Sequence, residues 1–171
     1  MTIAADVFTR VQDCAEKAAK ILENGQAITP QTVYTRRCAA DIAKAAIFDA
    51  LQAAFITPVD REDLWRLCEA GERLLCAAER FWLEMGCQNR TPSSPIDTMC
   101  HALARACRVC GTAADPSSAK AVRYAQQVCY TVREQRYTDT AVRDLCDRGC
   151  CVAEACEHLL YVRRYTTLKN T

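Results

Sequence analysis

The stretch LWRLCEAGERLLCAAERFW, residues 64–82, returns 78 residues later as VRDLCDRGCCVAEACEHLL, residues 142–160, with no gap between the two copies. In each copy, apolar or small residues recur at spacings of three and four, as they do on the buried face of an amphipathic helix. We interpret the match as an internal duplication. Each copy forms the last of three predicted helices, so the duplicated unit is a three-helix bundle.

Prolines that follow a capping residue mark four helix starts, at Thr29-Pro30, Thr57-Pro58, Ser94-Pro95 and Asp115-Pro116. Proline fits the first helical position because its missing N–H would have no partner there. The side chain of the preceding residue can accept a hydrogen bond from a backbone N–H of the first turn. Glycines stand near three of the expected helix ends, as is typical of helix C-termini. These signals predict six helices over residues 2–24, 30–55, 58–86, 95–112, 116–135 and 139–165.

The six helices divide into two equal groups. No segment has a convincing strand pattern, and the longest connector is CQNRTPSSP at residues 87–95. We therefore predict an all-α protein of two tandem three-helix bundles. The first repeat covers residues 1–90 and the second covers residues 91–171.

The bulk properties exclude several classes of protein. A formal net charge of +1 over 171 residues gives no basic surface of the kind that nucleic acids require. No apolar run approaches the roughly 18 residues that cross a bilayer. Asp6 and Arg10 stand where a signal peptide would carry its apolar segment. We expect a soluble, cytoplasmic protein that does not bind nucleic acid and is at most peripheral to a membrane.

Cysteine is the unusual component, with thirteen residues in the chain. Because the number is odd, at least one thiol stays unpaired in any intramolecular disulfide scheme. Two interpretations remain open: small buried side chains kept reduced, or thiolates collected for soft metals or redox chemistry. Helical position favours core packing for Cys14, Cys100, Cys107, Cys110 and Cys156.

The segment FDALQAAFITPVDREDLWRL, residues 48–67, resembles the signature of PhoU-like proteins, in the branch that accompanies Pit-type inorganic phosphate transporters. The features that carry the resemblance are the turn at residues 55–58 (FITP) and the charged run at residues 60–63 (DRED). The match is strong over residues 38–75 and weaker over 120–168. It implies a tandem of two three-helix bundles, in agreement with the duplication.

The resemblance also implies a role and a metal site. PhoU-like proteins resemble adaptors or regulators of phosphate uptake, and many hold iron or zinc clusters with acid-x-x-x-acid motifs. In this chain the family's acidic stripe falls on Cys68, Glu72 and Cys76 in the third helix and on Cys146, Cys150 and Glu154 in the sixth. In the second helix Arg37 replaces the first acid and Asp41 keeps the second, while Cys129 lies near the equivalent face of the fifth helix.

Each of the two stripes offers two thiols and one carboxylate at positions i, i+4 and i+8, along the flank of the helix's apolar face. A donor from a neighbouring helix could complete a tetrahedral set, and thiolates favour Zn²⁺, Fe or Cu(I) over hard ions. The alternative is that the thiols are reduced remnants of an ancestral acidic site. The candidate metal ligands are Asp41, Cys68, Glu72, Cys76, Cys129, Cys146, Cys150 and Glu154.

Nothing in the sequence indicates catalysis. Its two histidines have no nucleophile placed beside them by a readable motif, and its five glycines form no phosphate-binding loop. The predicted function is an accessory or regulator of phosphate transport that docks on a phosphate permease or a signalling protein, with self-association left open. Two alternatives remain: a Cu(I)- or zinc-binding helical bundle, and a purely structural or oligomerising bundle.

Overall fold

The structure, a computed structural model of the chain, describes residues 3–24, 28–54, 57, 59–87, 94–136 and 138–169. These residues form no strand, and the predicted all-α class with six helices is confirmed. The helices are α1 (Ile3–Asn24), α2 (Pro30–Ala53), α3 (Arg61–Cys87), α4 (Ser94–Thr112), α5 (Pro116–Gln135) and α6 (Thr140–Lys169). Over the described residues, none of them has both the length and the apolar character needed to cross a lipid bilayer.

Two of the predicted helix starts are confirmed in detail. Thr29 is extended (φ −114°, ψ 157°), and its hydroxyl accepts a hydrogen bond from the backbone N–H of Thr32. The carboxylate of Asp115 accepts from the backbone N–H of Ser118 at 2.8 Å. A proline occupies the first turn after each cap. Both helices therefore begin where a polar side chain satisfies donors that the helix itself leaves without partners.

The start of α3 differs from the prediction. The helix begins at Arg61 rather than at residue 58. Asp60 supplies the cap, because its carboxylate accepts from the backbone N–H of Glu62 and its carbonyl accepts from that of Leu64, both at 3.0 Å. Phe55, Ile56 and Pro58, three residues of the turn that carries the family resemblance, lie outside the described residues.

The last helix continues past its predicted end at residue 165. The Lys169 ammonium lies 2.9 Å from a carboxylate oxygen of Asp60 and 3.1 Å from one of Asp63, at the start of α3. Nearly two turns earlier, the Arg163 guanidinium donates to the carbonyl of Thr112 at 2.9 Å and to that of Gly111, at the end of α4. These contacts give the basic C-terminal turns of α6 defined partners on two other helices.

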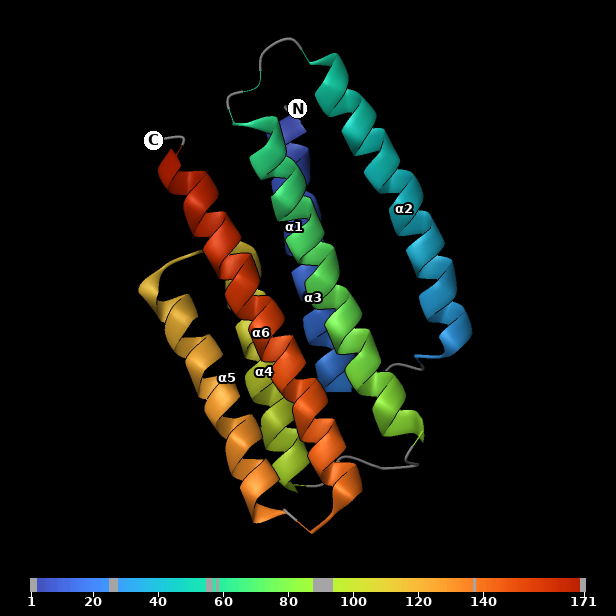
Figure 1. Ribbon diagram of the computed structural model, residues 1–171, viewed down its shortest axis with the longest axis vertical. Coiled ribbons are helices and arrows are strands. Elements are labelled where there is room, and N and C mark those ends of the chain that lie inside the picture. Colours follow the sequence, from blue (N-terminus) through green and yellow to red (C-terminus); the bar gives the residue numbers. More distant parts are fainter. Residues whose placement is uncertain are drawn as a thin grey trace.

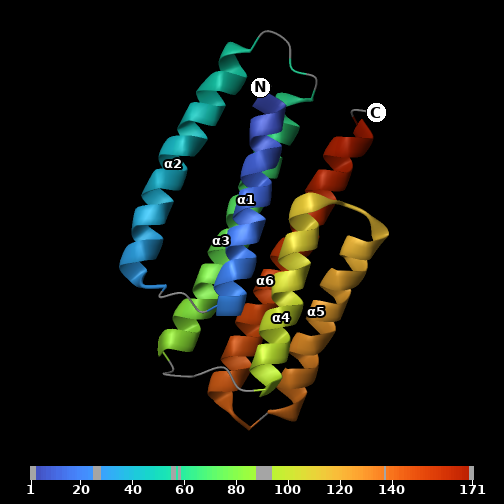
Figure 2. The ribbon, with the colours of Figure 1, turned by 180° about the vertical axis from the view of Figure 1, so that it is seen from behind.

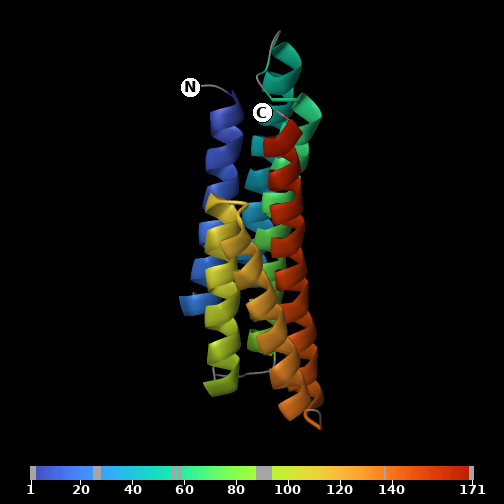
Figure 3. The same cartoon turned by 90° about the vertical axis from the view of Figure 1, so that its left-hand side faces the viewer.

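Four helices, α1, α3, α4 and α6, lie at the centre of an elongated bundle and share one hydrophobic core (Figures 1 and 3). Helix α5 packs along α4 and α6, whereas α2 stands off from α1 and α3 (Figure 2). The predicted repeats thus pack closely side by side, α1 against α4 and α3 against α6. Their boundary falls within residues that are not described and stays a prediction.

Two glycines at equivalent positions of the duplicated stretches lie at helix crossings. A Cβ added to Gly71 would lie 3.3 Å from Cα of Val11 on α1. A Cβ added to Gly149 would lie 3.2 Å from Sδ of Met99 on α4 and 3.1 Å from Sγ of Cys129 on α5. In each predicted repeat, therefore, the third helix approaches the first closely at the same duplicated glycine, as a duplication would produce.

The structure describes twelve of the thirteen cysteine side chains, and all twelve are free thiols. The five cysteines that the helical spacing predicts in the core are buried. Cys76 and Cys150, placed by the sequence on the flank of an apolar face, are half-buried, whereas Cys38 and Cys151 are exposed.

Candidate functional site

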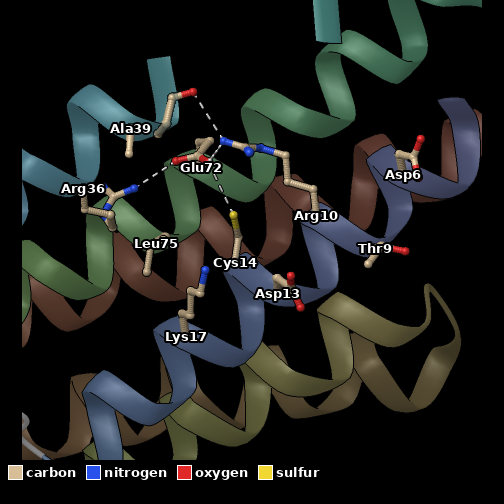
Figure 4. A pocket seen from close by; sticks show the side chains of 11 residues that line it. Asp6, Thr9, Arg10, Asp13, Cys14, Lys17, Arg36, Ala39, Glu72 and Leu75 are labelled. Atoms are coloured by element: carbon tan, nitrogen blue, oxygen red, sulfur yellow. Dashed lines mark hydrogen bonds and ion pairs between the residues drawn. The ribbon is translucent and has the colours of Figure 1, made fainter. Parts of the chain in front are cut away.

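The edge of α3 formed by Cys68, Glu72 and Cys76, here called the α3 edge, meets two arginines from neighbouring helices (Figure 4). Nη2 of Arg10, on α1, donates to one carboxylate oxygen of Glu72 at 2.6 Å. Nη1 of Arg36, on α2, donates to the other oxygen at 3.0 Å. The carboxylate of Glu72 therefore links α3 to both α1 and α2.

Arg36 also binds a second carboxylate, that of Glu79, about two turns further along α3 than Glu72. Its Nη2 donates to Glu79 at 2.7 Å, its Nε donates to the other oxygen of Glu79, and Nη2 reaches the sulfur of Cys76 at 3.4 Å. Glu79 is only 1% exposed. Burial alone would lower the pKa of Arg36, but its hydrogen bonds to Glu79 raise it. Arg36 is thus a permanent cation whose partner is a buried anion.

Two thiols of this region, those of Cys68 and Cys14, have raised pKa values. Burial raises the pKa of Cys68, although Arg10 opposes the shift. Burial, followed by the negative charge of Glu72, raises the pKa of Cys14 to about 12, and the Cys14 thiol lies 3.5 Å from a Glu72 oxygen. Both environments therefore favour the neutral thiol over the thiolate.

Two guanidinium groups therefore lie where the sequence predicted a metal ion. Both oxygens of Glu72 are engaged by them, and a divalent cation placed there would face two fixed positive charges. The same groups line a cavity of about 340 Å³ between α1, α2 and α3, with Asp13 and Lys17 also contributing to its wall (Figure 4). We expect this edge to be held together by arginine.

The predicted ligand on α2 is not part of this cluster. Asp41 is exposed, and no hydrogen bond or ion pair joins it to another described residue. The neighbouring carbonyl of Ala40 is the group that reaches the cluster, accepting from Arg10 at 3.4 Å. These positions give no support to the expectation that Asp41 completes a set of metal ligands at the α3 edge.

The equivalent edge of α6, formed by Cys146, Cys150 and Glu154, has different surroundings. A hydrogen bond from the buried Cys129 thiol on α5 lowers the pKa of Cys150, and the same bond raises that of Cys129. Burial, then the charge of Cys150, raises the pKa of Cys146 to about 11. Glu154 is exposed and lines a groove between α3 and α6. The structure brings the cysteines of α5 and α6 together, with Glu154 at the surface.

Within the described part of the chain, no three His, Cys, Asp or Glu side chains are placed so that they could hold a metal ion together. The predicted zinc or iron site, and the Cu(I) alternative, therefore stay predictions.

Sequence reasoning missed Arg10, Arg36 and Glu79. One signal was available: Glu79 lies fifteen positions after Leu64, about 60° from the centre of the apolar stripe at 100° per residue. An acid in that position is buried and requires a cation. Which arginine pairs with this acid depends on how α1 and α2 pack against α3. No local sequence pattern predicts that packing.

The sequence matches no protein-family model, and it matches no curated protein. The resemblance to PhoU-like proteins rests on the motif at residues 48–67 and on the duplicated helices.

Proposed function

We propose that this chain is a non-enzymatic, cytoplasmic accessory protein of inorganic phosphate uptake, similar in role to PhoU-like proteins, which docks on a phosphate permease through the outer face of α2. The observation that carries the proposal is the poor packing of α2, which buries only Val33 and Leu51. Its predicted counterpart α5 buries Ser118, Val122, Ala125, Cys129 and Val132.

The outer face of α2 presents an apolar stripe. Tyr34, Cys38 and Ile42 are exposed at spacings of four, so they lie along one side of the helix, and the small residues Ala45 and Ala46 continue the stripe. Ile42 is 73% exposed and Tyr34 is 65% exposed. Contiguous apolar side chains of this kind mark an interaction surface, and the helical spacing fits another helix.

The inner face of α2 is attached to α3 mainly by polar and aromatic contacts. Besides the Arg36 ion pairs, the Lys44 ammonium lies 3.9 Å from a carboxylate oxygen of Glu69. The ring of Phe48 packs edge-on against Trp65 with centroids 5.7 Å apart. These contacts fix the position of α2 without covering its outer stripe, so the stripe is presented on a defined helix.

The partner we assign is a helical cytoplasmic segment of a Pit-type phosphate permease. The resemblance to proteins that accompany this class of transporter covers residues 48–67, which include the C-terminal part of α2 and the first residues of α3. The uncovered stripe, at residues 34–46, therefore ends just before the motif begins in the sequence, and the features that carry the resemblance follow the end of α2 at Ala53. A second copy of the chain is the competing occupant.

Replacing Ile42 with aspartate should weaken binding to the permease about tenfold or more, because a charge would replace an apolar side chain at the centre of the contact. The measurement is biolayer interferometry with the permease of the same organism in lipid nanodiscs. Tyr161→Asp is the matched control, since Tyr161 is 68% exposed on α6, and it should bind like the wild type. Circular dichroism confirms that both variants remain folded.

Equal binding of wild type and Ile42→Asp would contradict the docking face. Analytical ultracentrifugation provides the second readout. A wild-type dimer that the Ile42→Asp variant loses would assign the stripe to a second copy of the chain and would overturn the assignment to the permease.

A further inference from the structure

A groove of about 630 Å³ runs between α3 and α6, which lie side by side and antiparallel (Figure 1). Ala77 and Ala155, equivalent positions of the duplicated stretches, form part of its lining and leave room for a ligand. Its charged lining comes mainly from Arg73 and Arg80 on α3 and from Arg148 on α6. We call this feature the arginine groove.

Among the residues that the structure describes, none provides a carboxylate partner for the three arginines of the groove. No Asp or Glu of the described residues lies within ion-pair distance of their guanidinium groups. Five arginines elsewhere form ion pairs, namely Arg10, Arg36, Arg66, Arg108 and Arg133, whereas others outside the groove, such as Arg105, Arg123 and Arg136, have no carboxylate partner among the described residues. The groove is therefore a local concentration of positive charge in a chain whose formal net charge is only +1.

One carboxylate and one imidazole also line the groove, those of Glu154 and His158. Three guanidinium groups against one carboxylate leave a net positive charge before any contribution from His158. All three arginines are exposed, so the charge is available to a ligand that arrives from solvent. In a concave site such charges reinforce one another and raise the local concentration of anions.

The positive charges are spread along the groove. Arg73 and Arg80 are seven residues apart on α3, which places their backbones about 10 Å apart along the helix axis. Arg80 and Arg148 also line an adjoining hollow of about 400 Å³, together with Leu83 and the carboxylate of Glu84. A ligand that satisfies all three arginines must carry several negative charges in a row.

We propose that the arginine groove binds a linear oligophosphate. The planar guanidinium group presents paired N–H donors that match the oxygens of a phosphoryl group, and successive phosphoryl groups repeat the same acceptors along a chain. The volume of the groove falls within the range of small-molecule sites. This inference stands on the groove alone and does not depend on docking through α2.

The test is isothermal titration calorimetry of the full chain with tripolyphosphate at low ionic strength, where surface charges are least screened. The wild type should bind one tripolyphosphate per chain. The Arg73→Gln/Arg80→Gln/Arg148→Gln variant should bind about tenfold more weakly or worse, a loss of at least 1.4 kcal/mol by the standard conversion. Glu154→Gln should bind more tightly, because it removes the one repelling carboxylate of the groove.

Three arginines outside the groove provide a charge-matched control. The Arg66→Gln/Arg136→Gln/Arg143→Gln variant carries the same change in net charge and should bind like the wild type. Equal weakening in the two triple variants would show general electrostatic attraction and overturn the site. The absence of binding by the wild type would overturn it as well.

Two further ligands test the chemical class. Orthophosphate should bind at least about tenfold more weakly than tripolyphosphate, since it reaches fewer of the arginines, and equal affinity would contradict a linear ligand. Adenosine triphosphate carries the same phosphoryl chain on a nucleoside. No described residue with a phenyl, phenol or indole ring lines the groove, so adenosine triphosphate should bind no more tightly than tripolyphosphate. Tighter binding would reassign the groove to nucleotides.

Discussion

Replacing Arg36 with methionine should lower the free energy of unfolding by about 3–5 kcal/mol, the usual effect of leaving a buried charge without its partner. Glu79 is 1% exposed and receives two of its hydrogen bonds from Arg36. Methionine keeps most of the aliphatic volume of arginine while removing the charge, so the change tests the loss of the ion pairs with Glu79 and Glu72 rather than a loss of packing. Urea unfolding followed by circular dichroism measures the effect.

Two variants control this experiment. Adding Glu79→Met to Arg36→Met should recover most of the lost stability, because apolar side chains can replace a buried ion pair with little loss. Arg66→Ala, which removes an exposed pair with Glu62 at side-chain exposures of 55% and 67%, should lower stability by less than about 1 kcal/mol. If Arg36→Met were as mild as Arg66→Ala, Glu79 would not depend on Arg36.

The second large effect is expected at the crossing of α1 and α4. A Cβ added to Gly111 would lie 2.5 Å from Cβ of Ala15, a separation that side chains do not adopt without a shift of the helices. Gly111→Ala should therefore lower the free energy of unfolding by about 1–3 kcal/mol, as overpacking does in other cores. Thermal and urea unfolding of the variant check the result.

The matched control is Gly86→Ala, near the end of α3, where an added Cβ meets no atom within 4 Å. This change should leave stability unchanged or raise it by up to about 1 kcal/mol, because alanine favours the helix. The Gly111→Ala/Ala15→Gly variant moves the methyl group to the other helix and should regain part of the loss. Similar effects of Gly111→Ala and Gly86→Ala would show that α1 and α4 do not approach so closely.

The helices could be predicted from sequence because their signals are local. Thr29 and Asp115 each precede a proline and cap the helix that follows. The start of α3 was placed too early because Asp60, inside the charged run, is a better acceptor for the first turn than the sequence pattern indicated. The end of α6 was placed too early because Lys169 is held by contacts with a distant segment.

The candidate site could be predicted only in part. Counting 100° per residue placed Cys76 and Cys150 on the flank of an apolar face, and both are half-buried. The partners of the α3 edge, Arg10 and Arg36, come from α1 and α2, and their side chains reach Glu72 only through the packing of three helices. The arginine groove likewise exists because the fold places α3 beside α6.

The arrangement at the α3 edge suggests how one charged cluster can replace another. A metal ion joins helices by binding carboxylates from each of them. Arg36 also joins two helices, because it lies on α2 and binds the carboxylates of Glu72 and Glu79 on α3. The position of α2, and with it the proposed docking stripe, then depends on the ion pairs of Arg36 with α3. On this account the cysteines at positions 68 and 76 are packing residues of the cluster.

Metal content tests most directly whether arginine has taken the place of a metal at the α3 edge. Inductively coupled plasma mass spectrometry is applied to wild type and to the Cys68→Ala/Cys76→Ala variant, both purified anaerobically. We expect the two proteins to carry the same amounts of zinc, iron and copper per chain. One or more ions per chain in the wild type, lost from the variant, would contradict the assignment of this edge to Arg10 and Arg36.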